Sequence, residues 1–155
     1  MKTDAVIEQQ DDEIVELGDI KQSPGFLLRI AQLKAFGSFF DQVGALGIKP
    51  GEFTVLWVVS LNPGLKQGAI ARTLHIKPAH MTKLVARLAG EGLMERTPDT
   101  IDRRAVRLTL TAKGEDFVAR NRSKFLDTDL AQRVSLTAEE AETLNALLRK
   151  FTGLD

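Results

Sequence analysis

The sequence has no cysteine, only two histidines and no long uncharged run of apolar residues. Without cysteine the chain can form neither a disulfide framework nor a thiol switch, which excludes peroxide sensing through cysteine oxidation. The lack of a long apolar run excludes a membrane span. The first residues soon turn acidic, which is wrong for a secretory signal or a transit peptide. Together these absences predict a cytoplasmic protein.

Patterns for catalysis and metal binding are also missing. His75 and His80 have no nearby cluster of carboxylates, whereas a zinc site generally needs three or four clustered ligands. The glycines form no phosphate-binding loop, and no nucleophile is paired with a base. We therefore expect no catalytic residue, no metal and no cofactor, and an enzyme is the least favoured class of function.

The residues that are present suit one compact domain with a local excess of positive charge. The chain has 155 residues, of which 43% are hydrophobic and 27% charged, as in ordinary globular proteins. Its 21 basic and 21 acidic residues cancel, but seven acids and only two bases lie in residues 1–23. Residues 66–107 hold nine bases and four acids. Such a stretch can neutralise phosphates although the whole chain carries no net charge.

Helical periodicity organises most of the chain after an acidic arm at residues 1–23, which we expect to be mobile. A long helix begins at Pro24 and ends before residue 47, with an apolar stripe wide enough for burial on two sides. Further helices are predicted at about 50–61, 67–74, 78–90 and 112–130. A last helix follows Thr137, which forms a capping box with Glu140.

The period changes between residues 93 and 110. Residues 93–97 are a short strand candidate, and Val106, Leu108 and Leu110 alternate with polar residues, which is typical of a strand with one buried face. A polar loop at 98–104 joins the two. The predicted fold class is mainly α with a small two-stranded antiparallel wing, that is, a winged helix-turn-helix over residues 48–111.

The helices that flank this module carry apolar stripes that the module alone would not cover. These flanking segments are residues 24–47 and 112–155. A homodimer that interleaves the terminal helices of two chains would bury the stripes. The alternative is that the helices pack only on their own module.

Several segments occur in an order and spacing typical of one family. They are IKPGEFTVL at 48–56, NPGL at 62–65, IARTL at 70–74, MTKLVARL at 81–88, GLMER at 92–96, DRRA at 102–105 and LTLTAKG at 108–114. Through them residues 25–115 resemble the multiple-antibiotic-resistance regulator (MarR) family of bacterial winged-helix regulators. The resemblance implies a homodimer that binds a pseudo-palindromic operator in double-stranded DNA, most often represses, and often responds to small aromatic or lipophilic effectors.

The sequence departs from the family pattern at three helix starts. Lys49, Lys66 and Lys77 stand where Ser, Thr or Asp is usual. Lysine cannot accept the hydrogen bond of an N-cap, so we expect each start to be weaker by about 1 kcal/mol. The lysines instead either direct extra positive charge at phosphates or have simply drifted at exposed positions.

Residues of the helix at 78–90 are assigned to DNA by their position on its outer face. A recognition helix enters the major groove with its outward-facing N-terminal residues nearest the bases. Since Met81, Leu84, Val85 and Leu88 form the inward stripe, base readout is assigned to Ala79, His80, Thr82 and Lys83. Phosphate contacts are assigned to Lys66, Gln67, Lys77 and Arg87.

The wing supplies the second predicted contact. Asp102-Arg103-Arg104 matches the family's Asp-x-Arg motif, which implies that Arg104 enters the minor groove, with Arg103 beside it. We expect Asp102 to brace an arginine of the loop through a charge-assisted contact.

An effector pocket follows from the resemblance. An arginine among aromatic residues could hold a carboxylate while rings stack on its aryl group. The candidate lining residues are Arg29, Phe36, Ser38, Phe39, Phe40 and Trp57. The competing interpretation is that the aromatic residues are core and that Arg29 forms a surface ion pair.

Two other functions remain open from the sequence. One is a winged-helix module that binds protein instead of DNA, and the other is a constitutive DNA-binding regulator without a ligand.

Overall fold

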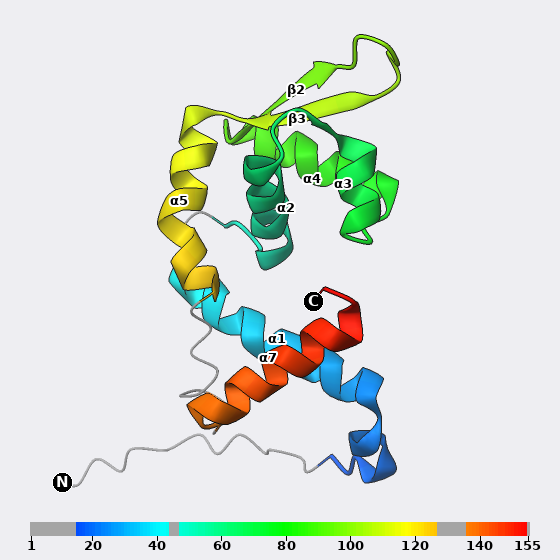
Figure 1. The fold of residues 1–155 in the computed structure, drawn as a ribbon, viewed down its shortest axis with the longest axis vertical. Helices are drawn as coiled ribbons and strands as arrows, with labels where there is room; N and C mark the ends of the chain where they lie inside the picture. Colours follow the sequence, from blue (N-terminus) through cyan, green and yellow to red (C-terminus); the bar gives the residue numbers. More distant parts are fainter. Residues whose placement is uncertain (1–14, 44–46, 127–135, 155) are drawn as a thin grey trace, which may run out of the picture. The chain divides into compact units, whose positions relative to one another are not determined.

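The computed structural model describes residues 15–43, 47–126 and 136–154, apart from the side chains of residues 38 and 40–43. The chain forms two compact units, which meet in the sequence at Leu33 and Lys34. Within the described part, the elements in chain order are the 3-10 helix η1 (Gly18–Gln22), α1 (Pro24–Val43), α2 (Pro50–Leu61), β1 (Leu65–Lys66), α3 (Gln67–Thr73), α4 (Pro78–Gly90), β2 (Met94–Pro98), β3 (Val106–Leu110), α5 (Ala112–Leu126) and α7 (Ala138–Thr152) (Figure 1).

The first unit contains η1 and the beginning of α1. Most of the arm predicted at residues 1–23 lies outside the described residues, and the described part of it contains η1. The helix predicted from Pro24 is confirmed, and α1 continues through the boundary into the second unit.

The core of the second unit is built from the helical stripes and from one face of a sheet. Met81, Leu84, Val85 and Leu88 of α4 are all buried, which confirms the predicted inward stripe. They pack with buried residues from the other elements of the unit. These residues are Phe39, Ile48, Phe53, Val55, Leu56, Val59, Ile70, Ala71, Leu93, Met94, Leu108, Phe117 and Val118.

The predicted wing is present as a hairpin of β2 and β3, with Met94 paired to Leu110 at one end and Pro98 to Val106 at the other. A third strand, β1, pairs antiparallel with β3, so the order in the sheet is β1-β3-β2. The sequence did not predict β1, because a strand of two residues is too short to show an alternating pattern.

The helix starts differ in how they are capped. No side chain caps α3 after Lys66 or α4 after Lys77, as expected for lysine. At α2 the carboxylate of Glu52 accepts a hydrogen bond from the backbone N–H of Lys49 at 2.8 Å. The capping box of α7 is confirmed, since the Thr137 N–H donates to Glu140 at 2.7 Å and the Glu140 N–H donates to the Thr137 hydroxyl at 3.2 Å.

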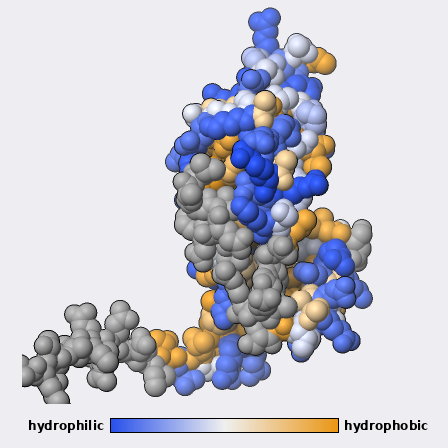
Figure 2. All heavy atoms as spheres, turned by 90° about the vertical axis from the view of Figure 1, so that its left-hand side faces the viewer, coloured by the Kyte–Doolittle hydropathy of each residue, from blue (hydrophilic) through white to orange (hydrophobic). Residues whose placement is uncertain are grey.

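Large apolar side chains are exposed on the helices that flank the winged module. Leu27 and Leu33 of α1 are 50% and 58% exposed, and Leu147 and Phe151 of α7 are 60% and 73% exposed. On the face shown in Figure 2, hydrophilic side chains dominate over the wing. An exposed apolar surface of this kind marks an interaction surface.

Gly114 in the first turn of α5 provides a stability test. A Cβ there would lie 2.0 Å from the carbonyl oxygen of Leu93 and 3.2 Å from the Cβ of Leu110. Gly114→Ala should therefore lower the free energy of unfolding by about 1–3 kcal/mol, since the backbone must move apart. At Gly51 of α2 a Cβ meets no atom within 4 Å. The control Gly51→Ala should raise the free energy of unfolding by about 0.5–1 kcal/mol. Urea unfolding followed by circular dichroism measures both, and equal midpoints for Gly114→Ala and wild type would contradict the packing.

Candidate nucleic-acid interface

The turn between α3 and α4 places the two helices at an angle to one another. His75 has φ +53°, a left-handed conformation that is uncommon for a residue other than glycine. The backbone N–H groups of Leu74 and Ile76 donate to Ile70 and Ala71 of α3, at 2.9 and 2.8 Å. These bonds end α3 and allow α4 to begin at Pro78 in a new direction.

The outer face of α4 is free for a partner. All four residues assigned to base readout, Ala79, His80, Thr82 and Lys83, are exposed. The hydroxyl of Thr82 donates to the Pro78 carbonyl at 3.0 Å and accepts from the Gln67 side-chain amide at 3.3 Å. Gln67 therefore links the start of α3 to the exposed face of α4.

Three of the four residues assigned to phosphate have side-chain partners within the chain. Lys77 is exposed, and Gln67 is half-buried with its amide on Thr82. The ammonium of Lys66, however, lies 3.3 Å from a carboxylate oxygen of Asp99. Arg87 is engaged by Glu52.

Arg87 joins three parts of the winged module instead of standing free on α4. Its guanidinium forms an ion pair with the carboxylate of Glu52 and donates to the Gly47 carbonyl at 2.7 Å. Glu52 is 8% exposed and also accepts from the backbone of Lys49. A buried carboxylate needs a cation and hydrogen bonds, and Arg87 is the cation within reach. We therefore leave Arg87 out of the DNA-contacting set.

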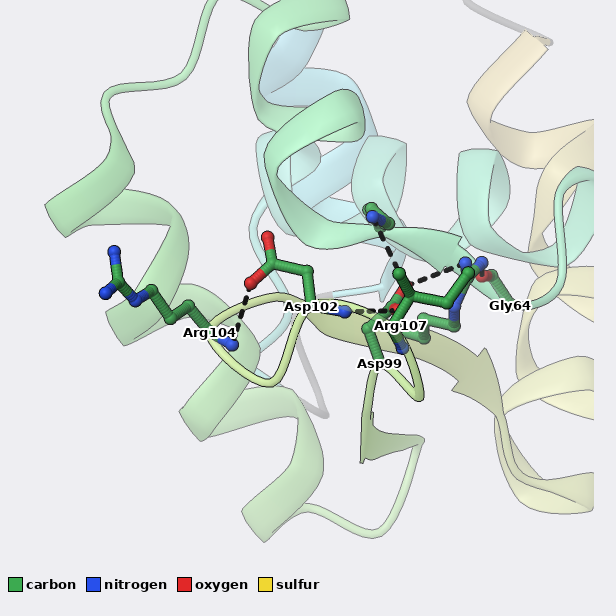
Figure 3. Close-up of polar contacts among 7 residues, drawn as sticks. Gly64, Asp99, Asp102, Arg104 and Arg107 are labelled. Atoms are coloured by element: carbon green, nitrogen blue, oxygen red, sulfur yellow. Dashed lines mark hydrogen bonds and ion pairs between the residues drawn. The ribbon is translucent and has the colours of Figure 1, made fainter.

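The wing presents its two arginines to solvent. Arg103 and Arg104 are exposed, and neither side chain has a hydrogen bond or ion pair with the residues that the structure describes. Figure 3 shows the Arg104 side chain extending away from the polar cluster at the base of the wing. An open cavity of about 370 Å³ between the wing and α3 is lined by basic side chains, including those of Lys66, Arg72 and Arg104.

The bracing role predicted for Asp102 requires a correction. Its carboxylate accepts from the backbone N–H of Arg104 at 3.1 Å, so Asp102 holds the backbone of the loop, not an arginine side chain. The carboxylate that binds a guanidinium is Asp99, which lies 2.7 Å from Arg107 and 3.3 Å from Lys66 (Figure 3). Asp99 was not predicted from the sequence to have a role. A signal was present, because Asp after Pro at the end of a strand is typical of a turn in which the carboxylate accepts backbone N–H groups.

Asp99 is buried, with 2% of its surface exposed. The backbone N–H groups of Asp102 and Ile101, with further contributions from Lys66 and Arg107, hold the pKa of the Asp99 carboxyl far below its usual value, although burial acts in the opposite direction. The carboxylate therefore remains charged at pH values where an ordinary aspartate begins to protonate. Its stabilising effect is present above the pKa of the unfolded chain and is lost as the pH falls towards the folded value.

The candidate effector residues are only partly brought together. Phe39 is fully buried in the core, which supports the competing interpretation for this residue. Phe36 and Trp57 are half-buried, and their rings lie 6.2 and 5.9 Å from that of Phe125. Arg29 is exposed and belongs to the first unit. The side chains of Ser38 and Phe40 lie outside the described residues.

No helix in residues 15–43, 47–126 or 136–154 is long and apolar enough to cross a membrane. The same ranges contain no group of three His, Cys, Asp or Glu residues that could hold a metal ion.

Known proteins resemble this chain over most of its length. Residues 48–106 match the model of the MarR family. A putative transcriptional regulatory protein for the hcr operon of Thauera aromatica is 31% identical over 139 residues, which cover 89% of this chain and 84% of that protein. These matches confirm the family predicted from the sequence.

Solved structures confirm the predicted fold. The transcriptional repressor CouR, bound to a 23-mer DNA duplex, is 30% identical with a TM-score of 0.76, and the match covers 91% of this chain and 98% of that chain. CouR bound to p-coumaroyl-CoA is 27% identical with a TM-score of 0.77, over 90% of this chain and 98% of that chain.

The contacts of Arg87 generate a second stability prediction. Arg87→Gln should lower the free energy of unfolding by about 1–3 kcal/mol, because the buried Glu52 then loses its cation. The control is Arg120→Gln, which removes an ion pair with Asp116 whose side chains are 71% and 59% exposed. It should cost less than about 0.5 kcal/mol. Urea unfolding measures the free energy of unfolding of both variants. Equal decreases in the two would show that the ion pair of Arg87 with Glu52 contributes no more to stability than a surface pair.

Proposed function

Because this chain belongs to the MarR family of transcriptional regulators, we propose that it is a homodimeric repressor that binds a pseudo-palindromic operator in double-stranded DNA. The observation that carries the proposal is the pairing of two free surfaces on one rigid module. The exposed face of α4 offers Ala79, His80, Thr82 and Lys83, and the wing offers Arg104. A protein of this kind works where the chromosome is, which in a bacterium is the cytoplasm.

Base readout is proposed for the first two turns of α4. Lys83 can donate to O6 and N7 of guanine, His80 offers a ring nitrogen, and the methyl group of Ala79 suits a thymine methyl. Thr82 is held by Pro78 and Gln67, so its contact is more restricted than that of its neighbours. Lys77 and Gln67 are proposed to contact phosphates, which fix the register without reading sequence.

The wing is proposed to contact the minor groove. Arg104 is exposed at the tip, and a slim cationic side chain is attracted by the negative potential of a narrow A·T-rich groove. Arg103 lies beside it and can reach phosphate. Lys66 contributes positive charge near the same cavity, although its ammonium is shared with Asp99.

Dimerisation is proposed through α1 and α7, with the remainder of the chain after α5. The support is the exposure of Leu27, Leu33, Leu147 and Phe151, since so much exposed apolar surface is better buried against a partner. A twofold symmetric dimer would present α4 twice, and this matches a pseudo-palindromic operator with half-sites one helical turn apart.

An effector is proposed to release the repressor. The support is the similarity to CouR, whose solved structure contains p-coumaroyl-CoA. Aromatic acids or their thioesters are the class we propose, with Phe36, Phe40 and Trp57 as ring contacts and Ser38 as a polar contact. Release requires only that the effector bind better to a dimer whose two α4 helices are wrongly spaced.

The DNA-binding proposal predicts a measurable loss at the wing. Arg104→Ala should weaken operator binding about tenfold or more. It should also reduce the slope of the logarithm of the binding constant against the logarithm of the salt concentration by about one, since one positive charge that neutralises the DNA is removed. The control Arg120→Ala removes the same charge from α5 and should change affinity less than about twofold. Salt-titrated fluorescence anisotropy on a fragment of the protein's own promoter measures both, and sedimentation reports the dimer. A wild type that shows no salt-sensitive binding would favour a protein-interaction module.

The effector proposal predicts coupled binding. p-Coumaroyl-CoA, benzoyl-CoA and the free aromatic acids are tested for thermal stabilisation and for release of bound DNA. An effector present at about 100 times its Kd should stabilise the folded protein by about 2.7 kcal/mol and so raise the Tm. Coenzyme A alone is the control. A regulator without a ligand would show neither effect with any of these compounds.

A further inference from the structure

We propose that Asp99 is the residue that positions the wing for DNA, by holding Lys66 and Arg107 together at the junction of the wing with the helix-turn-helix. This role rests on the proposed function, because it concerns where the wing meets the operator. Asp99 itself is buried and does not touch DNA. It acts through the two cations and through the backbone of the loop that carries Arg104.

One carboxylate oxygen of Asp99 fixes the loop. Its Oδ1 accepts hydrogen bonds from the backbone N–H groups of Ile101 at 2.7 Å and Asp102 at 3.0 Å. The N–H of Asp99 donates to the Ala105 carbonyl at 2.9 Å, so the loop closes on itself directly beyond the β2–β3 hairpin. Arg104 lies inside this closed loop, and its direction therefore depends on these three bonds.

The other oxygen of Asp99 joins two cations that would otherwise repel each other. Lys66 of β1 and Arg107 of β3 are direct cross-strand partners. Like charges directly opposite one another destabilise a strand pair. Asp99 Oδ2 lies 3.3 Å from the Lys66 ammonium and 2.7 Å from the Arg107 guanidinium. The single carboxylate thus converts a repulsive pair into an attractive group of three charges.

The same group of charges connects the wing to α3 and α4. β1 has only two residues and leads directly into α3, so it has few other bonds to hold it on β3. Arg107 also donates to the Gly64 carbonyl at 2.8 Å, and the Gly64 N–H donates to Leu108 at 2.8 Å (Figure 3). Gln67, the first residue of α3, bonds to Thr82 of α4. Loss of the β1–β3 contact would therefore change the distance between Arg104 and the exposed face of α4.

Charge alone and positioning predict opposite results when Asp99 is neutralised. Removing a negative charge near DNA should tighten binding, since DNA is a polyanion. Loss of the wing's position should weaken it. Asp99→Asn tests this sharply, because the amide oxygen can still accept from Ile101 and Asp102 while the ion pairs are lost. The matched control is Glu95→Gln on β2, where an exposed carboxylate of the same hairpin is neutralised with the same change in net charge.

The expected result is that D99N weakens operator binding about tenfold or more in fluorescence anisotropy, while E95Q leaves it within about twofold or tightens it. In the D99N background, the further change R104A should weaken operator binding less than about twofold, because Arg104 on a misplaced wing no longer contacts the DNA. Hydroxyl-radical footprints of D99N should lose the protection of the minor-groove sugars, while dimethyl sulfate should still show protection of guanine N7 in the major groove. Binding by D99N as tight as by E95Q, or additive losses with R104A, would overturn the proposal.

Two further measurements separate this role from general instability and from failure of the proposed function. Amide hydrogen exchange at Gly64 should be faster in D99N than in wild type, and this needs no DNA. If D99N alone does not fold, D99N/R107Q should, because the repulsion is relieved, and additivity with R104A in that variant overturns the proposal. A wild type that binds no DNA defeats the proposed function and the positioning role together, whereas a binding wild type with an unaffected D99N defeats the positioning role alone.

Discussion

Burial of one stripe of α4 decides how every other part of the winged module can act. Met81, Leu84, Val85 and Leu88 are held in the core by α2, β2, β3 and α5, so the opposite face of the same helix has to point outward. The residues on that face are exposed to a partner by the burial of the opposite stripe alone. A helix that lost this anchor would present nothing in a fixed orientation, and the wing would have no fixed partner at the second groove.

Two buried carboxylates then decide which basic residues remain available. Glu52 holds Arg87 against the start of α2, and Asp99 holds Lys66 and Arg107 at the base of the wing. A buried charge without a partner is costly, so these cations are recruited inward before any outside partner is considered. The two carboxylates thus hold three of the nine bases of residues 66–107. The six others are exposed, and they are Arg72, Lys77, Lys83, Arg96, Arg103 and Arg104.

The aromatic residues of α1, α2 and α5 pack mainly against one another in the core. Phe39, Phe53, Trp57 and Phe125 lie with ring centroids 5.0–6.0 Å apart, which links α1, α2 and α5. The fully buried rings of Phe39 and Phe53 are core, whereas the half-buried Phe36 and Trp57 keep an accessible edge.

The sequence by itself determined the helices, the hairpin, the exposed face of α4 and the family, because each depends on periodicity or on segments that lie close together in the chain. It predicted neither β1 nor the ion group of Asp99, Lys66 and Arg107. It also did not predict that Asp102 holds a backbone N–H or that Arg87 pairs with Glu52. Only the tertiary structure decided those points. The partners there are separated by up to 43 residues in the chain, and which carboxylate meets which cation depends on how the strands and helices pack. A local sequence pattern predicts which face of a helix or strand a side chain lies on. It does not predict which residue from a distant part of the chain will lie beside it, and ion pairs form between such distant residues.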